Sequence, residues 1–263
     1  IGYNSYFFQE LGAAVNSVET LLVNSRQLAS HPVVADRVRR AEVIFLAGGD
    51  QSNYYNYWHG TPLAAALQAR LAEGAAMGGT SAGAAVMGSW AFTAEAGTVT
   101  SGEALADPFH PRVQIRQTTL AHPALAGWLT DTHYNRPDAA DAPSQTRQGR
   151  HVAFLARLAA QSLAVRGLGL EERTAVGLQE GQVRVWGAGR AFFLVPAGSP
   201  PAPEVCAPGQ PLTWHRGGLA LRVRAVQGTA QGTAPQPLAG LEAPAGPGGA
   251  PWHVQAGVLS AGN

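Results

Sequence analysis

MGGTSAGAA, residues 77–85, places a serine among small residues in a G-x-S-x-G pattern. This pattern is typical of a nucleophile elbow, a strained turn between a strand and a helix that projects the hydroxyl of Ser81 out of the chain. The glycines and alanines leave room for the turn, and the free N–H groups at the start of the next helix face the same point. An ordinary glycine-rich loop has the same composition, so the five-residue pattern alone does not separate the two interpretations.

Segments before this turn alternate between helical and extended patterns. We expect helices at residues 3–15, 33–40 and 61–73 and strands at residues 18–23, 42–47 and 75–77. The apolar run at 42–47 is typical of a buried parallel strand, and the tight Gly48-Gly49-Asp50-Gln51 loop follows it. The alternation predicts an α/β fold with a parallel sheet covered on both faces and with sites at the carboxyl ends of its strands.

Strands outnumber helices in the second half of the chain. We expect residues 92–111 to be irregular, and we expect a helix at 148–160, strands at 165–170 and 191–195, and a hairpin of 174–178 with 182–186. Beyond residue 196 proline and glycine dominate, which predicts one strand at 219–226 and a flexible tail. The expected organisation is an α/β domain at residues 1–195, with its first strand missing upstream, and a C-terminal extension at residues 196–263.

Composition excludes several classes of function. The 263 residues include 18 basic and 17 acidic side chains, a balance that favours neither nucleic acid nor an anionic membrane surface as a partner. All 18 basic residues are arginine, which excludes a lysine Schiff base or a lysine general base. Cys206 is the only cysteine, so an internal disulfide and a cysteine-rich zinc site are excluded as well. No apolar run approaches the roughly 20 residues of a membrane span.

A serine nucleophile needs a neighbouring base, and His133 is the best placed of the eight histidines. It stands in the polar segment Asp131-Thr132-His133 after an apolar run, whereas the other histidines lie beside proline or lack such a setting. A carboxylate must then orient the imidazole. The first candidates are Glu171 and Glu172, at the end of an expected strand, and the alternatives are Glu95, Glu103 and Asp131.

An oxyanion hole requires two preorganised N–H donors. The N–H of Ala82, directly after Ser81, is the first candidate. The Gly48-Gly49-Asp50 turn offers the second, and we expect Gly49 to provide it because glycine lets the backbone approach a substrate closely. A simple strand-to-helix turn would contain the same glycines.

Five motifs in this order resemble those of the cyanophycinase and peptidase E family of serine exopeptidases. They are FLAGGDQ (45–51), GGTSAGAAVM (78–87), DTHY (131–134), RQGR (147–150) and GLGLEERTA (167–175). The resemblance implies a flavodoxin-like three-layer sandwich akin to class I glutamine amidotransferases, with serine in place of their cysteine. It implies Ser81 as nucleophile, His133 as base and Glu172 as the orienting acid. This chain order differs from the Ser, acid, His order of α/β-hydrolases, which argues against a lipase or esterase.

The resemblance also implies a substrate pocket lined by Gln51, Asp131, Arg147 and Arg150, where arginines suit a substrate carboxylate. Family members cleave after aspartate, either in the β-Asp-Arg polymer cyanophycin or in Asp-X dipeptides. Two departures bear on the substrate: Thr132 replaces the glutamine usual between the aspartate and the histidine, and the segment between Tyr134 and Arg147 is longer than usual.

We therefore expect a serine peptidase that hydrolyses peptide bonds at aspartyl residues through an acyl-enzyme. We expect it to use no cofactor and no metal, to be cytoplasmic and to form a homodimer. The alternative is a catalytically silent homologue that binds peptides or a protein partner through the same pocket. The presence of all three residues of the implied triad favours the enzyme, and an amidase of the amidotransferase type is disfavoured because its cysteine is absent.

Overall fold

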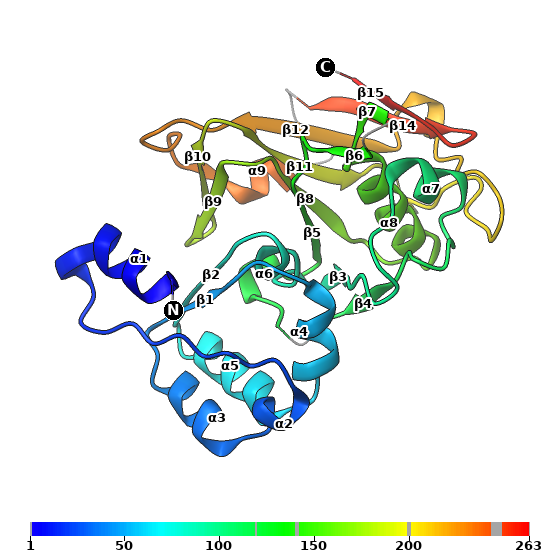
Figure 1. Ribbon diagram of the computed structural model, residues 1–263. Coiled ribbons are helices and arrows are strands. Elements are labelled where there is room, and N and C mark those ends of the chain that lie inside the picture. Colours follow the sequence, from blue (N-terminus) through cyan, green and yellow to red (C-terminus); the bar gives the residue numbers. More distant parts are fainter. Residues whose placement is uncertain (1, 119, 140–141, 199–200, 243–248, 263) are drawn as a thin grey trace.

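The computed structural model describes residues 2–118, 120–139, 142–198, 201–242 and 249–262. The described strands form four sheets, and two of them, one of two strands and one of eight, lie one above the other with helices around them (Figure 1). The helices are α1 (Gly2–Leu11), α2 (Arg26–Ala29), α3 (Pro32–Arg39), α4 (Gln51–Trp58), α5 (Pro62–Ala72), α6 (Ala82–Ala85), α7 (Ser101–Ala106), α8 (Gln148–Ala160) and α9 (Leu238–Glu242). The strands are β1 (Val43–Leu46), β2 (Ala76–Gly79), β3 (Trp90–Phe92), β4 (Ile115–Gln117), β5 (Trp128–Thr132), β6 (Pro137–Ala139), β7 (Ala142–Thr146), β8 (Arg166–Leu170), β9 (Thr174–Gln179), β10 (Gln182–Gly187), β11 (Arg190–Pro196), β12 (Leu221–Gln227), β13 (Gln236–Pro237), β14 (Ala250–Gln255) and β15 (Val258–Ala261).

The smaller sheet consists of β1 and β2, which pair in parallel as predicted. Ile44 and Leu46 are buried in a cluster with apolar side chains of α3 and α5, the helices below this sheet in Figure 1. The expectation of a strand buried on both faces is wrong, because Val43 and Phe45 are 68% and 43% exposed. Phe7 of α1 packs edge-on against Phe45, with ring centroids 5.3 Å apart, and covers this face only in part.

The larger sheet has eight strands in the order β15-β14-β12-β11-β8-β5-β3-β4. Strands β3, β5 and β8 are parallel to one another. Strand β4 and the strands from β11 onward run antiparallel to their neighbours. The predicted α/β class is confirmed, and the large sheet is mixed: the parallel strands β8, β5 and β3 are adjacent, and antiparallel strands flank them on both sides.

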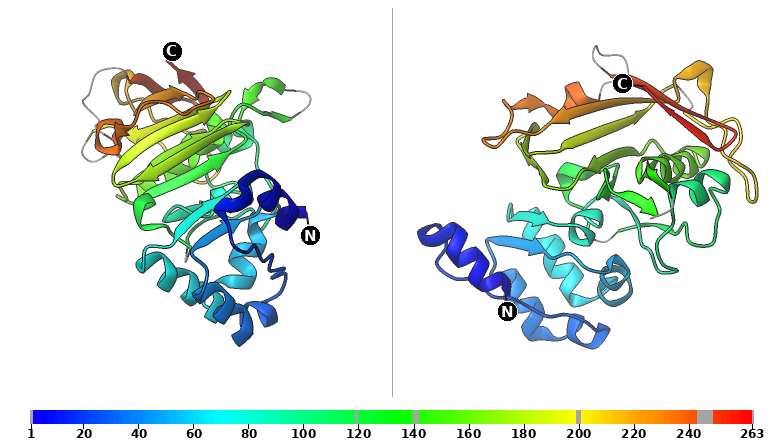
Figure 2. Two further views of the ribbon diagram at one scale, coloured as in Figure 1. Left: turned by 90° about the vertical axis from the view of Figure 1, so that its left-hand side faces the viewer. Right: turned by 45° about the horizontal axis from the view of Figure 1, so that its top comes forward.

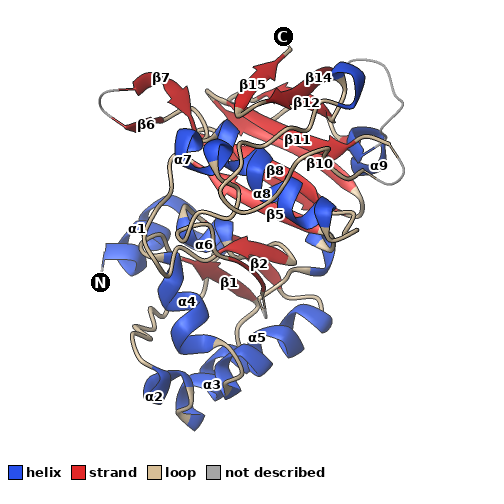
Figure 3. Ribbon diagram, turned by 90° about the vertical axis from the view of Figure 1, so that its right-hand side faces the viewer, coloured by secondary structure: helices blue, strands red, loops and turns tan. Residues whose placement is uncertain are grey.

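Both faces of the larger sheet are covered, each by a different kind of element. Helices α7 and α8 lie on one face (Figure 3), and α8 is buried along most of its length. On the other face the predicted hairpin β9–β10 packs with α9, so that Val183, Val185 and Leu241 contact Leu168 and Phe193 of the sheet. The layers are therefore helices, sheet and hairpin.

Two glycines of β8 explain how the large sheet accommodates α8. A Cβ at Gly169 would lie 2.5 Å from the ring of Tyr134, and one at Gly167 would lie 2.8 Å from Nε2 of His151. Real Cβ atoms do not approach other atoms so closely, because interiors are packed at crystal density. The G-x-G spacing in β8 therefore makes room on one face for these two rings.

The expected strand at residues 18–23 is wrong, because this segment is irregular. Leu22 is 76% exposed, and the carbonyl of Val23 accepts a hydrogen bond from the indole N–H of Trp58 at 3.1 Å. A segment with period-two alternation forms a strand only where another strand pairs with it. Here the Val23 carbonyl is hydrogen-bonded to a side chain of α4 instead.

Residues 92–111, expected to be irregular, contain the end of β3 and the helix α7. Thr100 and Glu103 form a capping box: the Glu103 N–H donates to the Thr100 hydroxyl at 3.2 Å, and the Thr100 N–H donates to the Glu103 carboxylate at 2.9 Å. The T-x-x-E spacing is a sequence signature of a helix start, so this helix could have been predicted.

For the described residues after the strand at 219–226, the expectation of a flexible tail is also wrong; residues 243–248 and 263 lie outside the described part of the chain. That strand is present as β12, and β14 and β15 continue the same sheet, with Trp252 only 3% exposed. The guanidinium of Arg184 donates to the carbonyls of Gln231 and Thr233 at 3.0 and 2.9 Å, which holds the glycine-rich loop against β10. The sheet thus continues across residue 195. The hairpin of β6 with β7 is separate from it and projects near α7 (Figure 2).

Candidate active site

Ser81 lies in a strained turn between β2 and α6, with φ 52° and ψ −118°. Few residues other than glycine adopt such backbone angles unless the surrounding structure enforces them. A Cβ at Gly83 would lie 2.1 Å from the Leu46 carbonyl oxygen, and a Cβ at Gly79 would lie 2.7 Å from the Gly83 carbonyl carbon. The glycines of the G-x-S-x-G pattern are therefore required by close contacts among β1, β2 and α6.

His133 follows the carboxyl end of β5 and also has a positive φ, 54°. Its Nε2 lies 2.7 Å from Oγ of Ser81, and its Nδ1 lies 2.9 Å from Oε1 of Glu172, which follows β8. Because β5 and β8 are parallel neighbours, their carboxyl ends present these two residues side by side. Ser81, His133 and Glu172 thus form one continuous hydrogen-bonded chain.

The two adjacent glutamates have different partners. The carboxylate of Glu171 is buried and accepts the backbone N–H of Arg190 at 2.7 Å and its guanidinium at 2.9 and 3.2 Å. Glu172 is exposed and faces His133, and the hydrogen bond to His133 lowers the Glu172 pKa below its ordinary value. Of the two, Glu172 is therefore the residue that contacts the imidazole.

The other candidate carboxylates have other partners. Glu95 accepts from the Thr93 hydroxyl and from Arg116 at 2.7 and 2.8 Å, and Glu103 belongs to the capping box of α7. Burial would raise the pKa of Asp131, but its ion pair with Arg150 holds that pKa below the usual value. Each of these three carboxylates is thus bound to groups other than His133.

Gly49 and Ala82 were expected to supply the N–H donors of an oxyanion hole, and Ala82 directly follows Ser81 as the first residue of α6. Gly49 has a φ of 139°, a conformation that favours glycine, and a Cβ at the preceding Gly48 would lie 3.2 Å from Cβ of Ser81. Within the described part of the chain, neither the Gly49 N–H nor the Ala82 N–H donates a hydrogen bond to another group. Both N–H groups therefore remain candidates for the oxyanion hole.

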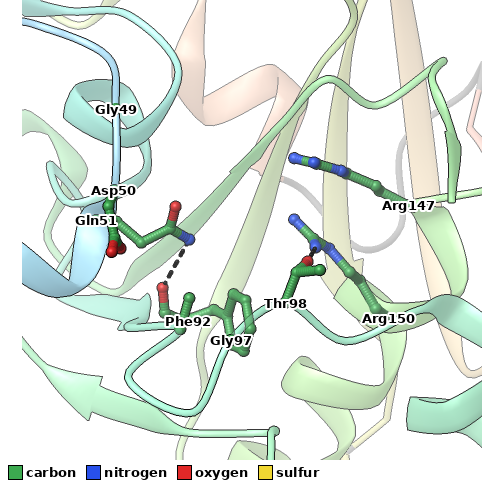
Figure 4. A pocket seen from close by; sticks show the side chains of 9 residues that line it. Gly49, Asp50, Gln51, Phe92, Gly97, Thr98, Arg147 and Arg150 are labelled. Atoms are coloured by element: carbon green, nitrogen blue, oxygen red, sulfur yellow. Dashed lines mark hydrogen bonds between the residues drawn. The ribbon is translucent and has the colours of Figure 1, made fainter.

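A pocket of about 290 Å³ is lined in part by Gly49, and by none of Ser81, His133 and Glu172 (Figure 4). Of the residues expected to bind substrate, Gln51, Arg147 and Arg150 line it, and Asp131 does not. In Figure 4, Gln51 reaches in from one wall and Arg147 and Arg150 from the other. The pocket residues that the sequence reasoning did not select are Asp50, Phe92, Ala94, Gly97 and Thr98.

Asp131 supports the pocket wall from behind. Its two oxygens accept hydrogen bonds from Nη2 and Nε of Arg150 at 2.6 and 2.8 Å, and both side chains are almost fully buried. Arg150 also donates to the Thr98 hydroxyl at 3.0 Å, and Arg147 donates to the Thr132 carbonyl at 3.0 Å. The ion pair therefore fixes the end of β5, directly before His133, to the start of α8.

The pocket residues that were not predicted differ in whether the sequence contains a motif that marks them. Asp50 belongs to the FLAGGDQ motif, and its carboxylate accepts the Ser52 N–H at 2.9 Å and caps α4, so its position could have been anticipated. Phe92 and Thr98 lie in a region without a motif: Phe92 ends β3, which pairs with β5, and the Thr98 hydroxyl accepts a hydrogen bond from Arg150 of α8. Only the tertiary structure reveals them.

The described residues contain neither a metal-binding cluster nor a membrane-spanning helix. No cluster of three or more histidine, cysteine, aspartate or glutamate side chains there has the geometry to hold a metal ion. None of the described helices combines the length and the apolar character needed to cross a bilayer.

Comparisons with known proteins agree with this architecture. Residues 3–186 match the sequence profile of peptidase family S51. Over 82 residues the chain is 40% identical to cyanophycinases of Synechococcus elongatus and Thermosynechococcus vestitus, a stretch that covers 31% of this chain and a quarter (25%) of each relative. A crystal structure of a peptidase from an acI-B1 actinobacterium shares the fold, with a TM-score of 0.55 and 14% identity over 90% of this chain and 75% of that one. Because the family profile matches well over half of its length, this chain belongs to peptidase family S51.

Proposed function

We propose that this protein is a serine peptidase that hydrolyses peptide bonds at aspartyl residues. The observation that carries the proposal is the hydrogen-bonded chain of Ser81, His133 and Glu172 in a member of a peptidase family. A hydroxyl, an imidazole and a carboxylate in that order make up the constellation that activates serine for acyl transfer on several unrelated folds.

In this mechanism Oγ of Ser81 attacks the carbonyl carbon of the scissile bond while its proton passes to Nε2 of His133. The carbonyl oxygen of the scissile bond becomes negatively charged and accepts hydrogen bonds from the N–H groups of Gly49 and Ala82. His133 then gives its proton to the leaving amine, which departs and leaves an ester on Ser81. Water, deprotonated by the same imidazole, hydrolyses that ester, and Glu172 stabilises the imidazolium in both halves of the reaction.

The pocket supports an acidic substrate side chain. Arginine pairs with a carboxylate in a bidentate geometry, and Arg147 and Arg150 both line the pocket. We propose that the two arginines together contact the substrate carboxylate, with Asp131 holding Arg150 in place. Gln51 donates its amide N–H to the Phe92 carbonyl at 3.1 Å, which orients its side chain across the pocket.

Two substrate classes fit an aspartyl peptidase of this family. The matched relatives are cyanophycinases, so a polymer of β-Asp-Arg units is the first, and small Asp-X dipeptides are the second. The competing function is a silent homologue that binds peptides in the same pocket without cleaving them. The short contact between Oγ of Ser81 and Nε2 of His133 favours catalysis.

A fluorophosphonate probe separates catalysis from binding alone. We expect covalent labelling of the wild type and none of Ser81→Ala, because only an activated serine reacts. Ser260→Ala is the matched control, since Ser260 is exposed on the edge strand β15, and it should label normally. Turnover of cyanophycin to β-Asp-Arg, or of Asp-X dipeptides to free aspartate, then identifies the substrate, and Ser81→Ala should lose on the order of 10⁴-fold or more in kcat. An unlabelled wild type that cleaves neither substrate would contradict the proposal.

A further inference from the structure

Asn135 joins the loop that carries His133 to the loop that carries Glu172. Its Oδ1 accepts the backbone N–H of Glu172 at 2.9 Å. Next to this contact the Tyr134 N–H donates to the Leu170 carbonyl at 2.9 Å, and the Arg136 N–H donates to the His133 carbonyl at 3.0 Å. Asn135 therefore lies in a closed turn that begins at His133, with its side chain fixed to the backbone of the acid.

Glu172 depends on its backbone for its position. Its side chain is 47% exposed, so packing restricts its rotamers little. The following residue, Arg173, has a φ of 56°, so the chain turns sharply here. On the preceding side, the Glu171 side chain is directed inward to Arg190. The Glu172 N–H thus ties this exposed turn to the turn that bears His133, two residues beyond the bond of the Tyr134 N–H to the Leu170 carbonyl.

The geometry points to Asn135 as a positioning residue for the reaction. By holding the Glu172 N–H, it keeps the Glu172 carboxylate within hydrogen-bond distance of Nδ1 of His133. Asn135 acts through Glu172, and it is not itself a catalytic residue. The inference rests on the proposed peptidase function for its kinetic consequence, whereas the tether itself can be tested without turnover.

The kinetic test is a double-mutant cycle on the aspartyl substrate that the wild type cleaves. Asn135→Ala should lower kcat about ten- to a hundredfold and leave KM unchanged, because the loss concerns orientation and not binding. In a Glu172→Gln background the same substitution should have no further effect. Asn135→Asp should recover part of the activity, since a carboxylate oxygen also accepts the N–H. Asn56→Ala is the matched control, because Asn56 is exposed on α4.

The second readout is the titration of the Glu172 carboxyl group, followed by carbon NMR in glutamate-labelled protein and assigned with Glu172→Gln. In the wild type the hydrogen bond to His133 lowers the Glu172 pKa. In Asn135→Ala this hydrogen bond should loosen, and the Glu172 pKa should rise toward its ordinary value. Asn56→Ala should titrate as the wild type does.

The outcomes separate the inference from the proposed function. An unchanged Glu172 titration in Asn135→Ala overturns the positioning role, as does an equal kinetic loss with and without the Glu172 carboxylate. If the wild type cleaves no aspartyl substrate but the Glu172 pKa still rises in Asn135→Ala, the tether is supported and the peptidase function is contradicted.

Discussion

His151 shows how one residue links the packing of this fold to its behaviour in acid. It is fully buried on α8, with Nδ1 3.1 Å from the Tyr134 hydroxyl and Nε2 3.2 Å from the Leu129 carbonyl oxygen. Burial lowers the pKa of this imidazole to about 4. The folded protein therefore keeps His151 neutral at pH values where the unfolded chain protonates it.

Acid should destabilise the protein through His151. Between the unfolded pKa of about 6.5 and the folded value near 4, the unfolded chain binds a proton that the folded one does not. Lowering the pH through this window should remove on the order of 3 kcal/mol from the free energy of unfolding. His151→Gln lacks the titrating group, so urea denaturation at pH 7 and pH 4.5 should show a flatter dependence. An equal pH dependence in both proteins would contradict this assignment.

At the scale of elements, the turn at Ser81 is fixed by the contact of α6 with the end of β1. The G-x-S-x-G pattern predicts this turn because the turn leaves no room for larger side chains. Gly83, for example, lies so close to the Leu46 carbonyl that a Cβ would not fit. His133 directly follows β5 and could be predicted from that polar setting. For the acid, the position after β8 left Glu171 and Glu172 open, and only the family resemblance selected Glu172. The Glu171 contact with Arg190 could not be predicted, because it depends on the pairing of β8 with β11.

Gly83→Ala should disrupt this turn. The new Cβ would lie 2.1 Å from the Leu46 carbonyl oxygen, and this neighbour is backbone that cannot rotate away. We expect a loss of about 3 kcal/mol in the free energy of unfolding, together with loss of fluorophosphonate labelling. Gly240→Ala in α9 is the matched control, because nothing lies within 4 Å of the added Cβ, and it should change stability by less than about 1 kcal/mol. Similar urea midpoints for the two variants would refute the explanation.

For the whole molecule, the large sheet unites the strands of the site with the C-terminal part of the chain. Polar and glycine-rich composition suggested a tail after residue 227, yet Trp252 of β14 is buried and packs against Phe192 of β11. Composition averages over a segment and misses a few apolar anchors such as Trp252 and Val254. The larger arrangement could be predicted only as an α/β class, because strand order depends on long-range pairing.

Trp252→Ala should therefore destabilise the entire fold. Truncation of a buried aromatic side chain typically costs about 3–5 kcal/mol, since it removes apolar burial and leaves a cavity. Val258→Ala on the neighbouring strand is the control: Val258 is 66% exposed, and the change should stay within about 0.5 kcal/mol. Thermal unfolding followed by circular dichroism measures both. If the C-terminal strands were dispensable, Trp252→Ala would unfold like the wild type.

The half-covered face of β1 has a consequence for the protein in concentrated solution. Among the described strands, β1 has β2 as its one hydrogen-bonded neighbour, and Val43 and Phe45 are exposed. The uncharged, proline-free run Val43–Leu46 has the high β-propensity of segments that add to strands of other molecules. With a formal net charge of only +1, charge repulsion between copies is weak. We expect self-association to begin at this strand, so a charged side chain at position 43 is the natural change for keeping the protein dispersed.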